Sequence, residues 1–248
     1  RDVFDEVDVL VCGGGPAGVG AALAAAREGA RVMLVEQYGM IGGLWTAGLL
    51  NPFFECMGRG YVVDDLIARL KQREALGPWF YSHTFDVEAM KLVLEQMAAE
   101  AGVELLYYTR VADAIVDGGR LRGAVLESKA GRQAVLAGVT IDATGDGDIA
   151  ARAGCAYTVG REIDGLCQPM TLMFEIRGAG RFPEMHAARP LYDAMDAAIR
   201  KHGIDFELPF ERANYAPWII HLPQPGAAAA QMTHVYRMNP LDPADLTA

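Results

Sequence analysis

The stretch "VLVCGGGPAGVGAALAAAREGARVMLVEQ", residues 9–37, contains an apolar run, a glycine cluster, an alanine-rich segment and a second apolar run in succession. The first run, at residues 8–12, is typical of a buried parallel strand, and the alanines have high helix propensity. Gly29 supplies a stop signal for the helix, and residues 31–36 form a second strand that ends in Glu36. The pattern therefore predicts a β-α-β unit.

The glycines of this unit have the spacing that a bound dinucleotide requires. Gly13 permits a tight turn, Gly15 lets a pyrophosphate approach the backbone, and Gly18 lets the helix pack closely on the strand. The helix N-terminus offers N–H groups and a partial positive charge to the phosphates. Glu36 follows about 20 residues later, where an acid accepts hydrogen bonds from the adenosine ribose. We therefore predict a bound dinucleotide, which this half-site alone does not identify as NAD or FAD.

The composition fits a globular chain and argues against several classes of partner. The 248 residues are 52% hydrophobic and 22% charged, with a formal net charge of −10. An acidic chain is a poor match for nucleic acid or an anionic membrane, and no apolar run reaches the roughly 20 residues of a membrane span. The cysteines show neither a CxxC pair nor metal-ligand spacing, which favours free thiols, a cytoplasmic location and no metal. They are Cys12, Cys56, Cys155 and Cys167.

A glycine-rich loop follows the second strand, where a simple NAD domain usually turns into its next helix. The segment "QYGMIGGLWTAGLLNPFF", residues 37–54, holds Gly42, Gly43 and Gly48. Glycines at this point indicate a backbone that runs close beside an extended ligand. A flexible surface connection is the alternative, but Leu44 and its neighbours are too apolar for a solvated loop.

The segment from residue 85 to residue 144 predicts a helix and then four stretches of strand. The helix begins after Asp86 as its N-cap and ends at Gly102, and residues 103–109 form the next strand. Two joints with hairpin turn chemistry then separate three strands. The three strands cover residues 110–117, 120–129 and 132–144, the last of which includes a buried parallel strand. A β-meander at this position is not the simple doubly wound NAD pattern.

At this point the chain resembles the FAD-dependent oxidoreductases of the glutathione reductase-like superfamily, and within them the bacterial group of FAD-dependent oxidoreductases. The matching segments are "GGGPAG", "IGGLWTAG", "FDVEAMK", "IDATGDGDIAARAG", "GREIDGLCQPMTLMFEI" and "NPLDPADLTA". The resemblance implies an α/β fold, with a three-layer Rossmann-like FAD/NAD(P)-binding domain that has a parallel sheet and a β-meander. It implies FAD as the cofactor and two-electron oxidation or reduction of a small organic substrate. An NAD(P)-dependent dehydrogenase and a non-catalytic electron-transfer subunit are the alternatives.

The resemblance also implies which residues hold FAD. In the superfamily the segment corresponding to Ala143, Thr144 and Gly145 packs beside the adenosine diphosphate, and the backbone near Val111 faces the adenine. Asp146 and Asp148 are expected as ligand contacts or as N-caps of the helix that follows, with capping favoured. The expected cofactor contacts are Gly13, Gly15, Pro16, Ala17, Gly18, Glu36, Gln37, Gly42, Gly43, Thr46, Val111, Ala143, Thr144 and Gly145.

We expect an FAD-binding domain over residues 1–160 and part of an α+β substrate or cap domain over residues 161–248. The elements expected in the second domain are strands at 168–178, 218–225 and 231–239 and a helix at 187–203. Members of the resembled family run beyond this length, and a later Gly-Asp pair reaches the ribityl chain. We therefore expect the N-terminal portion of a longer flavoprotein, or one half of a cleaved one, and no working enzyme from these residues alone. A homo-oligomer is the alternative to a missing C-terminal portion.

The sequence assigns no catalytic residue, because a flavin carries out the electron chemistry itself. His83, His221 and His234 are candidate proton carriers, each with a structural role as the alternative. The other side chains considered for contact with a flavin or a substrate are Cys56, Trp45, Tyr61 and Tyr81. Apolar filling is the alternative for the three aromatic residues.

Overall fold

The computed structural model describes residues 3–54, 58, 60–79, 82–178, 189–205, 208, 218–231 and 234–247. The predictions for Cys56 and Tyr81 lie outside the described residues. The chain divides into two compact units. The first unit comprises Arg1–Gly48, Phe54–Leu76 and Phe85–Tyr157, and the second comprises Leu49–Phe53, Gly77–Thr84 and Thr158–Ala248. The domain boundary expected at residue 160 stays a prediction.

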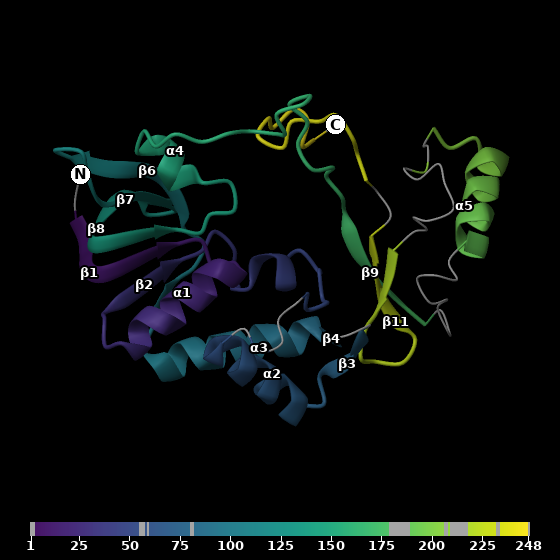
Figure 1. Cartoon of the computed structure of the whole chain (residues 1–248), viewed down its shortest axis with the longest axis horizontal. Coiled ribbons are helices and arrows are strands. Elements are labelled where there is room, and N and C mark those ends of the chain that lie inside the picture. Colours follow the sequence, from purple (N-terminus) through teal and green to yellow (C-terminus); the bar gives the residue numbers. More distant parts are fainter. Residues whose placement is uncertain are drawn as a thin grey trace. The chain divides into compact units, whose positions relative to one another are not determined.

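A six-stranded mixed sheet forms the centre of the first unit (Figure 1). Its strands are β1 (Val3–Cys12), β2 (Val32–Val35), β5 (Glu104–Leu106), β6 (Arg110–Asp117), β7 (Arg120–Ser128) and β8 (Gly131–Asp142). The order is β5-β2-β1-β8-β7-β6. The pairs β5–β2, β2–β1 and β1–β8 are parallel, whereas β6, β7 and β8 are antiparallel. The predicted α/β class, with a parallel sheet and a β-meander, is confirmed.

Strand β8 belongs to both halves of this sheet. Residues 131–136 pair with β7, and residues 134–142 pair with β1. The third strand of the predicted meander and the predicted buried parallel strand are therefore one continuous strand. The hairpin turns before β7 and β8 contain glycines with positive φ, as turns of this kind require.

Three helices of the first unit pack together, and a short fourth helix lies at the meander (Figure 1). They are α1 (Pro16–Arg27), α2 (Tyr61–Gln72), α3 (Val87–Ala101) and α4 (Asp148–Arg152), and a 3₁₀ turn, η1, spans Gly43–Trp45. Helix α3 begins and ends as predicted, because Asp86 accepts the N–H of Ala89 and Gly102 has a φ of 73°. Helix α2 was not predicted. Its N-cap is Gly60 without a side-chain cap, so the usual start signal is missing.

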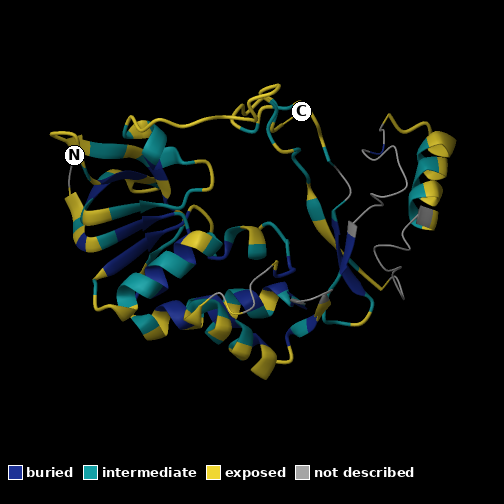
Figure 2. Cartoon of the chain, viewed as in Figure 1, coloured by how far each residue is buried: buried dark blue, intermediate teal, exposed yellow. Residues whose placement is uncertain are grey.

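Both faces of β2 and of the last three residues of β1 are buried, as is typical of parallel strands (Figure 2). Leu10 and Cys12 pack in one cluster with Met33 and Val35 of β2 and with Ile149 of α4. The intervening Val11 is fully buried on the other face. The first unit therefore has a core on each side of its parallel strands.

The second unit contains a three-stranded antiparallel sheet of order β10-β11-β9. Its elements are β9 (Met173–Arg177), β10 (Trp218–His221), β11 (Ala227–Gln231) and α5 (Arg189–His202), and β3 (Leu76–Trp79) and β4 (Ser82–Phe85) form a separate hairpin. The strands predicted at 168–178 and 218–225 and the helix at 187–203 are present, with shorter bounds. Among the described residues, no helix is long and apolar enough to cross a membrane.

Two predicted strands are wrong in their extent. Of the described residues in the strand predicted at 231–239, only Gln231 lies in a strand, and Val235 forms an isolated bridge with Met170. Arg237 has a φ of 63°, which no extended strand accommodates. Similarly, the strand predicted at 103–109 is reduced to β5, because Tyr108 has a φ of 51°.

Candidate cofactor site

Three parallel strands end together at one edge of the first unit's sheet. Cys12 of β1 is in register with Val35 of β2 on one side and with Asp142 of β8 on the other. The chain continues from β1 to β2 and β5 in one direction and later returns to the other side of β1 as β8. In open α/β sheets, ligands bind outside the carboxyl ends of the strands where the order reverses. The loops after these strands therefore form the candidate site.

The turn after β1 is in direct backbone contact with the helix that follows and with the end of β8. The N–H of Gly13 donates to the carbonyl of Val35 at 2.9 Å, and the N–H of Ala143 donates to the carbonyl of Cys12 at 2.8 Å. A Cβ at Gly13, which has a φ of 101°, would lie 2.3 Å from the Ala143 carbonyl oxygen. A Cβ at Gly18 would lie 1.9 Å from the carbonyl oxygen of Gly13. Both positions therefore exclude every side chain.

Gly15 lies in a different environment, although it belongs to the same motif. It is the N-cap of α1, and a Cβ there would meet no atom within 4 Å. Among the described residues no side chain caps this end of α1, and the first helical position is Pro16. The first hydrogen bond of α1 runs from the N–H of Val19 to the carbonyl of Gly15. The N–H group of the exposed Ala17 comes before this bond, so the helix itself offers it no acceptor. Gly15 therefore borders open space where helix donors are available to an anion.

Glu36 is held at the end of β2 by backbone donors. Its side chain is 6% exposed, and its Oε2 and Oε1 accept the N–H groups of Gly14 at 2.8 Å and Tyr38 at 2.9 Å. Each carboxylate oxygen can accept a further hydrogen bond. The carboxylate is therefore fixed in orientation and still has acceptor sites for a ligand. The following Gln37 is exposed.

The segment that leads into β6 runs beside Glu36. The N–H of Glu36 donates to the carbonyl of Leu106, and the N–H of Thr109 donates to the carbonyl of Glu36 at 3.1 Å. Val111 follows two residues later in β6 and is 8% exposed, because its side chain lies in the core. The structure thus brings the backbone before Val111 to the end of β2 where Glu36 lies.

The loop after Glu36 folds back onto the glycine turn. The N–H of Gly42 donates to the carbonyl of Gly14 at 2.7 Å, and a Cβ at Gly43 would lie 2.8 Å from the Cα of Gly15. The buried hydroxyl of Thr46 donates to the carbonyl of Ile41 at 2.8 Å and so closes the loop. The alternative of a flexible surface connection is therefore wrong.

Asp142, at the end of β8, organises the turn that leads into α4. Its Oδ1 accepts from the N–H of Thr144 at 3.1 Å and from the hydroxyl of Thr144 at 2.7 Å. Its Oδ2 accepts from the N–H of Ala150, in the first turn of α4, at 2.8 Å. The Thr144 Oγ1 in turn accepts the N–H of Asp148 at 2.9 Å. Sequence reasoning missed Asp142, although an Asp before a turn commonly accepts an N–H two residues later.

The prediction that Asp146 or Asp148 caps α4 is wrong. The N-cap is Gly147, which has a φ of 71° and provides no side-chain cap. Asp146 is exposed, and the carboxylate of Asp148 accepts from Nη1 of Arg152 at 2.7 Å. The capping acid is Asp142, because its carboxylate reaches the first turn of α4 from the end of β8.

The electrostatics of this edge favour a charged Asp142 and a neutral Cys12. Burial alone would raise the pKa of Asp142, but N–H donors of Ala150 and Thr144 outweigh it and hold the pKa below the ordinary range. Burial, together with the charge of Asp142, raises the pKa of the Cys12 thiol to about 12. Cys12 is therefore an apolar packing residue at neutral pH.

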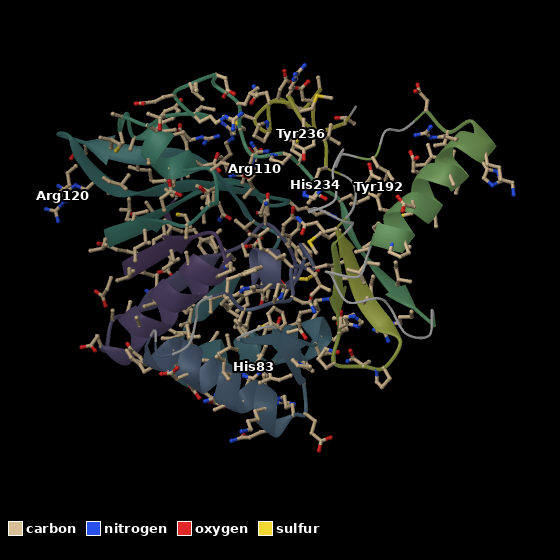
Figure 3. The ribbon with its side chains drawn as sticks, turned by 45° about the vertical axis from the view of Figure 1, so that its right-hand side comes forward. His83, Arg110, Arg120, Tyr192, His234 and Tyr236 are labelled. Atoms are coloured by element: carbon tan, nitrogen blue, oxygen red, sulfur yellow. The ribbon has the colours of Figure 1, made fainter. Side chains whose placement is uncertain are left out.

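The other side chains named from the sequence do not gather at this edge. Tyr61 is exposed, and the Arg27 Cζ lies 4.9 Å from the centroid of its ring. Trp45 packs edge-on against Phe85. His83, His221 and His234 belong to the second unit, and Figure 3 labels the side chains of His83 and His234. The ring of His234 stacks on Tyr236, with centroids 6.5 Å apart, and burial lowers its pKa. Within the described residues no group of three or more His, Cys, Asp or Glu side chains could hold a metal ion.

Comparison with known proteins places this geometry among flavoproteins. A family model described as FAD dependent oxidoreductase matches residues 8–248. The thiamine thiazole synthase of Aeropyrum pernix is 39% identical over 121 residues, which cover 48% of this chain and 43% of the synthase. The digeranylgeranylglycerophospholipid reductase of Methanospirillum hungatei is 33% identical over 160 residues, which cover 56% of this chain and 38% of the reductase. The chain thus spans less than half of the length of these relatives.

Solved structures share the fold at low sequence identity. A triple mutant of a flavin-dependent brominase matches with a TM-score of 0.64 and 18% identity, over 91% of this chain and 56% of the brominase. A geranylgeranyl bacteriochlorophyll reductase-like protein from Thermoplasma acidophilum matches with a TM-score of 0.59 and 17% identity, over 92% of this chain and 56% of that chain. These likenesses confirm the predicted fold, and the family match confirms FAD as the predicted cofactor.

The residues at the strand ends fit the adenosine diphosphate part of FAD. The open space at Gly15 and the N-terminus of α1, which has no side-chain cap among the described residues, suit a pyrophosphate. Glu36 has acceptor sites left for ribose hydroxyls. Among the described residues, no atom lies within 4 Å of the position that a Cβ of Gly15 would occupy.

Proposed function

The chain belongs to the family of FAD-dependent oxidoreductases, and from this we propose that it contributes to two-electron oxidation or reduction of a small organic substrate. The observation that carries the proposal is the contrast within the glycine motif. A Cβ would collide with backbone at Gly13 and Gly18 and would meet nothing at Gly15. Packing explains the first two glycines, whereas open space beside helix donors is what an approaching pyrophosphate needs.

We assign each part of the edge to a part of the cofactor. The backbone from Gly13 to Gly18 would hold the pyrophosphate, and the carboxylate of Glu36 would accept from the ribose. The backbone at Val111 would face the adenine. The further proposed contacts are Gln37, Gly42, Gly43, Thr46, Ala143, Thr144 and Gly145. We propose these residues because each lies on, or beside, a loop that follows β1, β2 or β8.

The protein's own contribution to the reaction is to bind and orient. FAD, when bound, supplies the electron transfer chemistry. The loop that contains Gly42 and Gly43 packs on the glycine turn, which limits the positions the turn can adopt. Fixed geometry of this kind matters because misplacement of a reacting atom by about 1 Å costs on the order of a hundredfold in rate.

The partners and the location also belong to the proposal. A small-molecule substrate is expected, with no nucleic acid and no membrane, because the net charge is −10. A cytoplasmic location is supported by Cys12, Cys155 and Cys167, which are free thiols. Self-association into a homo-oligomer is also part of the proposal.

The test is the identity of the bound cofactor and its reduction by substrate. The purified protein is denatured by heat, and the released cofactor is separated by chromatography. FAD is expected, whereas recovery of FMN alone or of NAD(P) would overturn the assignment. The protein is then screened anaerobically with small organic substrates for bleaching of its flavin absorbance. Turnover without any partner protein would argue against an electron-transfer subunit.

A further inference from the structure

We infer that Asp142 is a positioning residue for FAD, which with Thr144 fixes the turn over residues 143–147 against the glycine turn. This inference rests on the proposed function, because it concerns the same cofactor. It assigns a role to a residue that neither the glycine motif nor the predicted cofactor contacts include.

The hydrogen bonds around Thr144 form a directed chain. The Thr144 hydroxyl has one hydrogen, which it donates to Oδ1 of Asp142 at 2.7 Å. The Thr144 Oγ1 in turn accepts the N–H of Asp148 at 2.9 Å. The Thr144 N–H also donates to Asp142. The side chain of Thr144 therefore has no donor left for a ligand, and it acts on FAD through the position of its backbone.

Asp142 connects this chain to two rigid elements. It is the last residue of β8, and its other oxygen accepts the N–H of Ala150 in α4. Its carboxylate thus holds the strand end, the turn and the helix start in one geometry. Hydrogen bonds to a charged acceptor are stronger than those between neutral groups, so the charge of Asp142 strengthens the hydrogen bonds that it accepts.

The position of the turn is transmitted directly to the pyrophosphate side of the site. Ala143 precedes Thr144, and its N–H donates to the carbonyl of Cys12, the residue before Gly13. Its carbonyl oxygen lies 2.3 Å from the position that a Cβ of Gly13 would occupy. Release of Thr144 from Asp142 should therefore disturb Gly13 and the open space at Gly15 together.

The test separates this role from simple helix capping. Four variants and the parent are freed of FAD, and two quantities are measured: the FAD dissociation constant by flavin fluorescence and the thermal unfolding midpoint of the apoprotein. The variants are Asp142→Asn, Thr144→Val, Thr144→Ser and the double variant Asp142→Asn/Thr144→Val. The matched control is Asp117→Asn, which removes the same charge from an exposed position at the end of β6.

We expect Asp142→Asn and Thr144→Val each to weaken FAD binding about tenfold, which corresponds to about 1.4 kcal/mol. The double variant should bind FAD no more weakly than the weaker-binding single variant, because both substitutions disrupt the same Asp142–Thr144 hydrogen bond. Thr144→Ser keeps the hydroxyl and should bind like the parent, as should Asp117→Asn.

Two outcomes would overturn the inference. One is an apoprotein of Asp142→Asn that melts earlier but binds FAD as tightly as the parent, which would leave Asp142 as a helix cap alone. The other is additive losses in the double variant. If Asp142→Asn does not fold, Thr144→Val decides, because it leaves the cap on Ala150 in place. A parent that binds no FAD would instead refute the proposed function.

Discussion

The carboxylate of Glu36 accepts the N–H of Gly14 at 2.8 Å across 22 residues of sequence. The acid that ends the second strand thus holds the glycine turn that follows the first strand. Its second oxygen holds the N–H of Tyr38 in the same way. Glu36 is therefore part of the architecture of the cofactor edge as well as a candidate ribose acceptor.

Glu36→Ala should reduce both FAD binding and the stability of the apoprotein. The variant removes hydrogen bonds to a charged group, each of which contributes about 1.5–3 kcal/mol. We expect FAD affinity to fall about tenfold or more and the apoprotein to melt earlier. Fluorescence titration and thermal unfolding check the two effects. Unchanged FAD affinity in a folded variant would contradict the ribose assignment, and an unchanged melting midpoint would contradict the structural role.

The glycines of the motif should separate into packing positions and a ligand position. Gly18→Ala forces a Cβ to within 1.9 Å of a backbone oxygen, and overpacking of this kind costs about 1–3 kcal/mol or more. Gly15→Ala introduces a Cβ into open space at a φ of −67°, where alanine is unstrained. We therefore expect Gly18→Ala to destabilise the apoprotein and Gly15→Ala to leave its denaturant midpoint nearly unchanged while weakening FAD binding.

Gly20→Ala is the matched control for this pair, because it lies in the same helix and its added Cβ would also meet nothing within 4 Å. It should leave both stability and FAD binding intact. Tight FAD binding by Gly15→Ala would show that the open space at this glycine is not the pyrophosphate site.

Cys12 should resist alkylation until the cofactor edge unfolds. It is fully buried, and its thiol pKa is raised to about 12 by burial and by the charge of Asp142, so little reactive thiolate forms near about pH 8. Cys155 is exposed and should react quickly. Iodoacetamide labelling followed by peptide mass spectrometry reads the two sites separately. Labelling of Cys12 at the rate of Cys155 would mean that the glycine turn opens readily in solution.

Local patterns predicted the first unit well because its constraints are local. The spacing of Gly13, Gly15 and Gly18 and the acid at Glu36 predicted the β-α-β unit, and Asp86 and Gly102 predicted the bounds of α3. The glycine-containing turns predicted the meander. Apart from Gly15 and Glu36, which we assign to the cofactor, each of these residue types is required by its own backbone conformation or by a neighbour a few positions away.

The features that the sequence did not reveal depend on distant contacts. Helix α2 begins at Gly60 without a capping side chain, and its face is defined by packing on α1 and α3. The alanines of β11 have high helix propensity, yet they pair with β9 and β10 in a sheet. Asp142 was overlooked because its cap on Ala150 lies eight residues away, whereas Asp146 and Asp148 are nearer to α4.

The hold of Asp142 on its turn should weaken in acid. Burial opposes ionisation of Asp142, but the surrounding donors prevail and its pKa lies below the ordinary range. A carboxylate with a lowered folded-state pKa contributes stability that is complete above the ordinary Asp pKa of about 3.9 and is lost as the pH falls through the folded value.

The side-chain amide of the Asp142→Asn variant does not titrate. We therefore expect the difference in unfolding free energy between the parent and Asp142→Asn to be constant at about pH 5–7 and to shrink below about pH 4. The neighbouring Cys12 stays neutral throughout, and the Asp148–Arg152 pair is common to both proteins. Urea unfolding of the two apoproteins across this range measures the difference, and a difference that persists unchanged into strong acid would show that the charge of Asp142 is not what holds the turn.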